Sequence, residues 1–253
     1  MTDRENAATN PLPATTSMKF SMVVPTYNEA GGIERLVTTL AAVFKENGLD
    51  GELIVVDDNS PDGTGAIVDE LEARGYPVRC LHRPGKMGLS SAVIDGWNFA
   101  RPDSVAVGAM DGDFSHDANV LPRMVSALQN GGYGLAIGSR YVPGGGIANW
   151  PKRRIITSRI AIALAQPLTA IKDITSGYFL VKRDALRGVQ LDPIGFKIGL
   201  EVIAKAHYGR AIEVPYVFTD RVAGTSKLNQ NEILNYLKQL GRIYAGRLIG
   251  KGG

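Results

Sequence analysis

The feature that most constrains the fold is a pattern of strand, turn and helix that repeats up to residue 137. An apolar run at residues 19–25 is followed by a polar turn and by helical periodicity at residues 32–46. The same sequence of elements recurs with apolar runs at residues 52–56, 77–81 and 104–110, and a fifth run follows at 133–137. Strands that alternate with helices predict an α/β fold with a mostly parallel, Rossmann-like sheet and helices on both faces.

The regular alternation of strands and helices ends after Arg140. A glycine-rich loop at residues 143–146 leads into a segment at 149–171 that is first basic and then apolar. Beyond it we expect a strand at 177–182, a helix at 196–208 and a strand at 212–218. The chain is therefore expected to have three parts, which are a disordered N-terminal tail at 1–17, a single α/β domain at 18–229 and an amphipathic C-terminal helix at 230–253.

Composition excludes several classes of protein. With 44% hydrophobic and 21% charged residues the chain is neither disordered nor a membrane bundle, and a net charge of +3 gives no reason to expect a nucleic acid partner. A spanning helix needs roughly 18 to 20 uninterrupted apolar residues. Because Arg159 and Pro167 interrupt the best candidate, membrane contact is expected to be peripheral or mediated by a partner.

Two carboxylates, Asp111 and Asp113, directly follow the fourth predicted strand. Hard cations such as Mg²⁺ and Mn²⁺ prefer oxygen ligands, and Mg²⁺ commonly takes one or two carboxylates together with substrate phosphates. The glycine between them, Gly112, lets a bulky ligand approach the backbone closely. An ordinary turn also uses Asp-Gly-Asp, so the motif alone leaves both interpretations open.

Two further polar motifs, at residues 25–29 and 56–64, end the first and second predicted strands. In a doubly wound sheet ligands bind beyond the carboxyl ends of the strands, so three polar motifs converge on one crevice. For Glu29 and Asp58 the alternative is hydrogen bonding within a turn or at a helix start. Asp57 and Asp62 are weaker candidates for the site, because a tight turn would use aspartates at these positions in any case.

With these motifs the sequence resembles the dolichol-phosphate mannose synthases, which are inverting glycosyltransferases of family 2 with the GT-A fold. The resemblance extends from about Lys19 to the C-terminal helix. It also includes residues 111–116 and 138–141, Asp173 with 175–177, 195–197 with Glu201, and Arg221 ahead of 224–228. It departs from many relatives at Gly112, where they have Ala, and from some at Ser115, where they have Gln.

The resemblance implies roles for individual residues, with Asp113 and Arg140 as the catalytic pair. The metal would be held by Asp111, Asp113 and Ser115, the last through a hydroxyl that can coordinate a hard cation directly or through water. The acceptor's phosphate would be bound by Arg140, Arg154 and Ser158. The donor would be bound by Pro25, Tyr27, Glu29, Val56, Asp58, Asp111, Gly112, Asp113, Arg221 and Lys227.

The implied reaction transfers mannose from GDP-mannose to a polyprenyl (dolichyl-type) phosphate with inversion, assisted by Mg²⁺ or Mn²⁺. A phosphate acceptor is already anionic at neutral pH, so no general base is required and no histidine needs a catalytic role. His116 and Asp117 are expected to cap the next helix. The loop at 219–228, which carries Arg221 and Lys227, is expected to close over bound donor.

Two helical segments suggest contact with a membrane surface. The basic start and apolar body of residues 150–171 suit a helix lying in the headgroup plane, although a helix packed on the sheet has the same pattern. Arg154 and Ser158 lie one turn apart there, either facing one phosphate or forming part of a solvated basic face. The C-terminal helix is likewise either a lipid contact or a helix whose apolar stripe packs onto the domain. We expect a cytoplasmic enzyme bound peripherally to the cytoplasmic face of a membrane, with a membrane-spanning subunit as a candidate partner.

Two rival functions stay open. One is a related enzyme that uses UDP-glucose with the same acceptor, and the other is a noncatalytic module that binds nucleotides or anionic lipids. The presence of every implied metal and phosphate contact, including Arg221 and Lys227, argues against a degenerate binder. The glycine-rich motifs of dinucleotide-binding and P-loop proteins are absent from the sequence.

Overall fold

The computed structural model describes residues 17–192, 194–195, 197–219 and 230–249, with side chains of the last segment described for 232–247. Its main sheet has seven strands and is mostly parallel, as predicted. Only β7 runs antiparallel to both of its neighbours. The spatial order is β3 (Val78–His82), β2 (Gly51–Asp57), β1 (Phe20–Thr26), β4 (Ala106–Ala109), β7 (Phe179–Lys182), β5 (Leu135–Ser139) and β8 (Ala211–Pro215).

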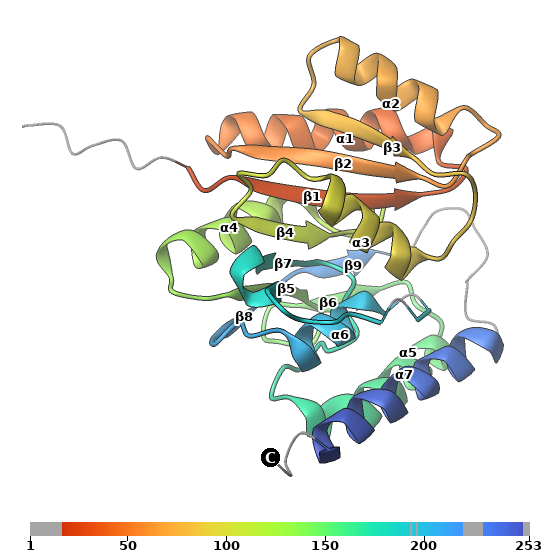
Figure 1. Ribbon diagram of the computed structural model, residues 1–253, viewed down its shortest axis with the longest axis vertical. Coiled ribbons are helices and arrows are strands. Elements are labelled where there is room, and N and C mark those ends of the chain that lie inside the picture. Colours follow the sequence, from red (N-terminus) through yellow and green to blue (C-terminus); the bar gives the residue numbers. More distant parts are fainter. Residues whose placement is uncertain (1–16, 193, 196, 220–229, 250–253) are drawn as a thin grey trace, which may run out of the picture.

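Helices cover both faces of this sheet (Figure 1). The two faces have separate cores because side chains alternate along each strand, so that Met22 and Val24 of β1 join one core and Val23 the other. The first core includes α1 (Ala30–Glu46), α2 (Thr64–Ala73) and α4 (Leu121–Asn130). The second includes α3 (Leu89–Phe99) and α6 (Ile198–Lys205). Short 3₁₀ turns lie at Ala118–Val120, Gln166–Leu168 and Arg183–Leu186.

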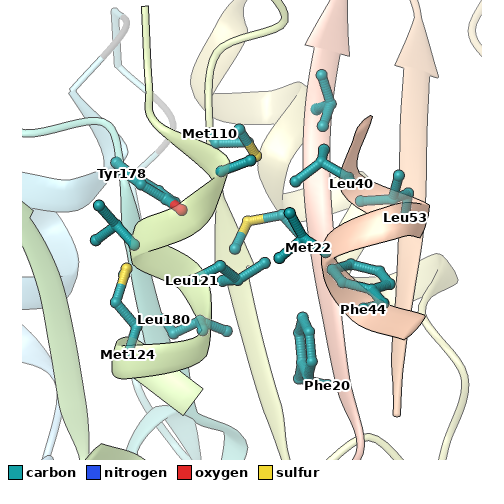
Figure 2. Close-up of a cluster of buried hydrophobic side chains, with 14 of the residues drawn as sticks. Phe20, Met22, Leu40, Phe44, Leu53, Met110, Leu121, Met124, Tyr178 and Leu180 are labelled. Atoms are coloured by element: carbon teal, nitrogen blue, oxygen red, sulfur yellow. The ribbon is translucent and has the colours of Figure 1, made fainter. Parts of the chain in front are cut away.

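The first core reaches from the amino ends of the strands to the edge that carries the predicted site. Phe20 and Phe44 meet edge to face at its base, with ring centroids 5.3 Å apart. Met22, Met110 and other side chains fill its middle (Figure 2). The fully buried Tyr178 completes it, and its hydroxyl donates to the backbone oxygen of Asp117 at 3.3 Å. The core therefore supports the chain just after Asp111 and Asp113 directly.

The single strand expected at residues 212–218 is two strands, β8 and β9 (Val217–Thr219), in different sheets. Tyr216 joins them, because its N–H donates to Ser139 of the main sheet and its carbonyl accepts from Gly146. The second sheet pairs β9 with β6 (Gly146–Ala148), a strand that the sequence did not predict. The chain thereby turns toward the strand ends where the polar motifs lie.

The two segments with a predicted membrane role, α5 (Lys152–Ala165) and α7 (Gln230–Ile249), lie side by side at one end of the molecule (Figure 1). Tyr236 and Tyr244 of α7 donate hydrogen bonds to backbone oxygens of α5, at 2.5 and 2.8 Å. Ala165 of α5 is buried in the second core and Ala161 and Ile162 pack against it, so one side of this helix packs onto the domain, while Ile156, Ile160 and Leu164 are exposed. On α7 an apolar stripe of Tyr236, Leu240 and Ile243 is buried, as the packing alternative predicted.

Within the described ranges, every helix is too short or too polar to cross a membrane.

Candidate active site

The polar motifs meet where the strand order of the sheet reverses. β1 pairs with β2 on one side and β4 on the other, and a parallel α/β sheet opens its ligand crevice at such a point. Asn28, Asn59 and Phe114, one in each of the three loops that follow these strands, have positive φ angles of 59°, 56° and 61°. The backbone of a non-glycine residue rarely adopts this conformation; asparagine tolerates it best, whereas at Phe114 it costs about 1–2 kcal/mol. Residues in this conformation tend to cluster at functional sites.

The residues expected to hold the donor's base and ribose lie at the ends of β1 and β2 or in the loops that follow them. Pro25 pairs with Val56 across β1 and β2, and Val56 is fully buried in the second core. Glu29 begins α1 without a side-chain cap bond, and its N–H donates to the Thr64 hydroxyl at 2.9 Å. The ammonium of Lys86, which the sequence did not single out, lies 3.5 Å from the ring centroid of Tyr27.

Asp58 is held by a buried ion pair and not by turn hydrogen bonds alone. The Nε of Arg83 donates to its carboxylate at 2.6 Å, and another guanidinium nitrogen reaches Asp95 at 3.0 Å. Arg83 is 5% exposed, which makes it a fixed support for Asp58. Asp57 and Asp62 have the turn roles expected of them, since they accept from the backbone N–H groups of Ser60 and Thr64 respectively. The one signal that could have pointed to Arg83 is its position directly after the third strand.

Asp111 and Asp113 follow β4, and Asp113 is fixed by Ser115. Its Oδ1 accepts from the Ser115 N–H at 3.1 Å and from the Ser115 hydroxyl at 2.5 Å. A Cβ on Gly112 would lie 3.2 Å from Val24, which leaves little room for a larger residue. Two carboxylates and a hydroxyl are hard oxygen ligands, so the residues present fit Mg²⁺ or Mn²⁺. Direct coordination by Ser115 stays a prediction, because in this structure its hydroxyl binds Asp113.

His116 positions Asp111 and does not cap a helix, so that part of the prediction is wrong. The backbone N–H of Asp111 donates to Nδ1 of His116 at 3.1 Å, which assigns the proton of the neutral ring to Nε2, 3.9 Å from the Asp111 carboxylate. Burial lowers the pKa of His116 and keeps the ring neutral. Asp117 does cap, since it accepts from the Asn119 N–H at 2.9 Å.

Arg140 is anchored by Asp173, which is completely buried. The guanidinium donates through Nε and Nη2 to the two carboxylate oxygens at 2.8 and 2.7 Å, and Nη2 also reaches the Thr175 hydroxyl at 3.1 Å. Although burial opposes the charge, Asp173 raises the pKa of Arg140. The pair fixes a permanent cation at the end of β5.

An aromatic cluster of Trp150 and Phe218 brings Arg140 and Arg154 together. The guanidinium of Arg154 lies 4.1 Å from the Trp150 ring centroid, and that of Arg140 lies 5.4 Å from it. The ring of Phe218 lies within 6 Å of both guanidinium groups. Nearby, the hydroxyls of Tyr141 and Ser158 are 3.0 Å apart. The three residues expected to bind the acceptor's phosphate therefore gather at one place.

The acidic and basic groups lie on the same side of the molecule. His116, which binds the backbone of Asp111, stacks on Tyr178 at 5.0 Å and meets Phe218 of the aromatic cluster at 5.8 Å. Arg140, Asp111 and Asp113 all influence the pKa of its ring electrostatically. The two remaining predicted donor contacts, Arg221 and Lys227, and the loop expected to close over the donor lie outside the described residues.

Comparison with known proteins shows the family to which this chain belongs. Residues 21–189 match the model of Glycosyl transferase family 2. The chain is 41% identical to a dolichol-phosphate mannosyltransferase from Pyrococcus furiosus, over 89% of this chain and 64% of that protein's length. It is 38% identical to a dolichol-phosphate mannosyltransferase from Saccharomyces cerevisiae, over 90% of this chain and 88% of the yeast protein.

Among solved structures, the fold is similar to that of a mannosyltransferase from Pyrobaculum calidifontis in complex with GDP-Man and Mn²⁺, with a TM-score of 0.61. The two chains are 20% identical, and the match covers 90% of this chain and 64% of the other. This similarity confirms the predicted GT-A type of sheet. From the family match and the two relatives, the chain belongs to glycosyl transferase family 2, together with the dolichol-phosphate mannosyltransferases that it resembles.

Proposed function

We propose that the protein transfers mannose from GDP-mannose to the phosphate of a polyprenyl or dolichyl lipid, with inversion at the anomeric carbon. The observation that carries this proposal is the meeting of two unlike groups of side chains in one place. Asp111 and Asp113 offer oxygen ligands to a divalent metal that can in turn bind a nucleoside diphosphate, and Arg140 and Arg154 offer cations to a second phosphate. The names of the relatives from Pyrococcus and Saccharomyces support the choice of donor and acceptor.

In the proposed reaction an oxygen of the acceptor phosphate attacks the anomeric carbon of mannose and forms the new C–O bond. The bond from that carbon to the diphosphate oxygen breaks, and GDP departs with the electron pair. Arg140 and Arg154 orient the attacking phosphate, and the fixed Asp173 keeps Arg140 in place. No proton has to be removed from the attacking oxygen, so the neutral His116 has only a positioning role.

Asp111 and Asp113 would hold a divalent cation in this scheme, with Ser115 orienting Asp113. When bound there, Mg²⁺ or Mn²⁺ neutralises charge that develops on the departing diphosphate. The Mn²⁺ in the Pyrobaculum mannosyltransferase supports a divalent cation in the present chain.

We propose further that α5 and α7 rest on the membrane that contains the acceptor. Ile156, Ile160 and Leu164 of α5 are 58%, 57% and 46% exposed and lie on one face at intervals of four residues. Ile233, Leu234 and Leu237 of α7 are about equally exposed. Lys152 and Arg153 are exposed at the start of α5, where they suit anionic headgroups.

The transfer is tested with purified protein, a polyprenyl phosphate in vesicles, Mn²⁺ and GDP-mannose labelled in the sugar. We expect labelled lipid that is lost on chelation of the metal, and a product whose sugar has the β configuration by NMR. Labelled UDP-glucose in a parallel reaction tests the rival donor. A lipid product from UDP-glucose and none from GDP-mannose would show that the proposed donor is wrong.

The membrane contact is tested by flotation with vesicles that contain anionic lipid. The double variant Ile156→Ser and Ile160→Ser should float less than the unaltered protein while keeping its thermal midpoint, since both side chains are exposed. A matched control is Val105→Ser, which replaces another exposed apolar side chain, 49% exposed and just before β4. Equal flotation of all three proteins would argue against this surface.

A further inference from the structure

Lys197 is a cation at the active site to which the predicted set of site residues gave no role. It stands immediately before α6, and its ammonium donates to the backbone oxygen of Thr175 at 3.1 Å. The hydroxyl of the same Thr175 accepts from Arg140. One residue of the loop before β7 therefore holds both an ammonium and a guanidinium.

The charged groups that act on Lys197 include both arginines and carboxylates of the site. Burial, and then the nearby charge of Arg140, lower the pKa of Lys197 to about 8, and Arg154 acts in the same direction. Asp173 and Asp111 act in the opposite direction. A half-buried lysine near two arginines is unfavourable for the folded state, and such groups occur where a ligand of opposite charge is bound.

The backbone of Lys197 is tied to the helices that we propose lie on the membrane. Gln239 of α7, which is 1% exposed, donates to the carbonyl oxygen of Lys197 at 3.1 Å. On the same helix Tyr236 binds the backbone of α5. Lys197 thus contacts Thr175, which also binds Arg140, and it contacts α7, one of the two helices from which a lipid acceptor would arrive.

We propose that Lys197 is a third phosphate-binding cation, which contacts the acceptor's phosphate together with Arg140 and Arg154. A lipid monophosphate has three peripheral oxygens for these donors, and its negative charge offsets the repulsion among the three cations. The proposal deepens the proposed function and rests on it for the identity of the acceptor. It assigns Lys197 to the acceptor and not to the departing diphosphate.

The test measures binding without turnover, using farnesyl phosphate as a short polyprenyl phosphate and GDP with Mn²⁺ as the donor's leaving group. Lys197→Met should raise the Kd for farnesyl phosphate about tenfold or more, because a charge-assisted hydrogen bond is lost. The Kd for GDP with Mn²⁺ should change less than about twofold, and Lys197→Arg should recover part of the farnesyl phosphate affinity. The control is Lys45→Met at the end of α1, an exposed lysine that should change neither constant.

Thermal unfolding of each variant separates a loss of folding from a loss of binding. If Lys197→Met does not fold, Lys197→Gln keeps a donor for the Thr175 carbonyl while removing the charge, and the same rise in the farnesyl phosphate Kd is expected. Unchanged farnesyl phosphate binding in a folded variant, or a loss confined to GDP, would overturn the assignment. Wild-type protein that binds farnesyl phosphate but transfers no mannose would contradict the proposed function and leave the role of Lys197 standing.

Discussion

The carboxylate half and the basic half of the site are built in different ways. Asp58, Asp111 and Asp113 follow parallel strands of the regular sheet, and short loops place them at its edge. Arg140 and Arg154 come from a part of the chain where the strand and helix alternation has ended. A buried carboxylate, Asp173, and an aromatic side chain, Trp150, hold them in place.

Because of this difference, we expect substitutions in the two halves of the site to have different effects. Asp111 and Asp113 gain their positions from the backbone and from hydrogen bonds to near neighbours in the chain, so replacing either should abolish chemistry while the fold persists. Asp58 differs from them, because it shares a buried ion pair with Arg83. The basic half depends on a buried ion pair, so replacing the partner of that pair should reduce both stability and acceptor binding.

The largest effect is expected for Asp113→Ala. Loss of a metal ligand should lower kcat by about three orders of magnitude, as removal of comparable electrostatic stabilisation does elsewhere, while the thermal midpoint stays close to that of the unaltered protein. The exposed Asp103, which pairs with Lys19, offers a control in Asp103→Asn, which should keep full activity. Activity retained by Asp113→Ala would break the assignment of the carboxylate half.

The next largest effect is expected for Asp173→Asn, which leaves the buried Arg140 without a compensating charge. We expect the free energy of unfolding to fall by about 3–5 kcal/mol, measured by urea denaturation. Asp192→Asn removes the partner of Arg242 in an exposed pair and should cost at most about 1 kcal/mol. Equal costs for the two variants would show that the basic half does not depend on its buried pair.

A smaller effect is expected for Trp150→Ala, which removes the ring shared by Arg140 and Arg154. A cation–π contact contributes about 1–2 kcal/mol, so the KM for the acceptor should rise roughly tenfold while the KM for the donor is maintained. Tyr133→Ala removes a ring that lies 4.5 Å from Arg210 before β5 and should leave both constants unchanged. A rise in the donor KM instead would place Trp150 with the carboxylate half.

The smallest effect is expected for Ser115→Ala, since Asp113 keeps its carboxylate and loses one orienting hydrogen bond. A hydrogen bond to a charged group contributes about 1.5 kcal/mol, so the Mn²⁺ concentration that half-activates the enzyme should rise about tenfold. Metal activation that is the same in the variant would exclude both roles considered for Ser115, as a ligand and as an orienting group.

The parts of the molecule that could be predicted from sequence are those with a local signal. Alternating strands and helices predicted the sheet, and polar residues directly after strands predicted that Asp58 and Asp111 lie at the same edge of it. Asp57 and Asp62 make the turn hydrogen bonds that their sequence context predicted, because turn chemistry depends on near neighbours.

The parts that could not be predicted depend on contacts between residues far apart in the chain. Arg83 supports Asp58 across 25 positions, and Asp173 supports Arg140 across 33. His116 has a helix-start position in the sequence, yet the aromatic residues packed around it turn its ring toward Asp111. The split of the expected strand at 212–218 has the same origin, because Tyr216 exchanges partners between two sheets.

The central claim is that the carboxylates and the arginines serve one reaction center, and paramagnetic relaxation tests it most directly. Mn²⁺ and GDP are added to the protein, and the ³¹P signal of bound farnesyl phosphate is recorded. The account predicts strong broadening of that signal by Mn²⁺, which is lost in Asp113→Ala because the metal no longer binds. An acceptor phosphate that binds the wild-type protein and remains sharp with Mn²⁺ and GDP in place would contradict the account.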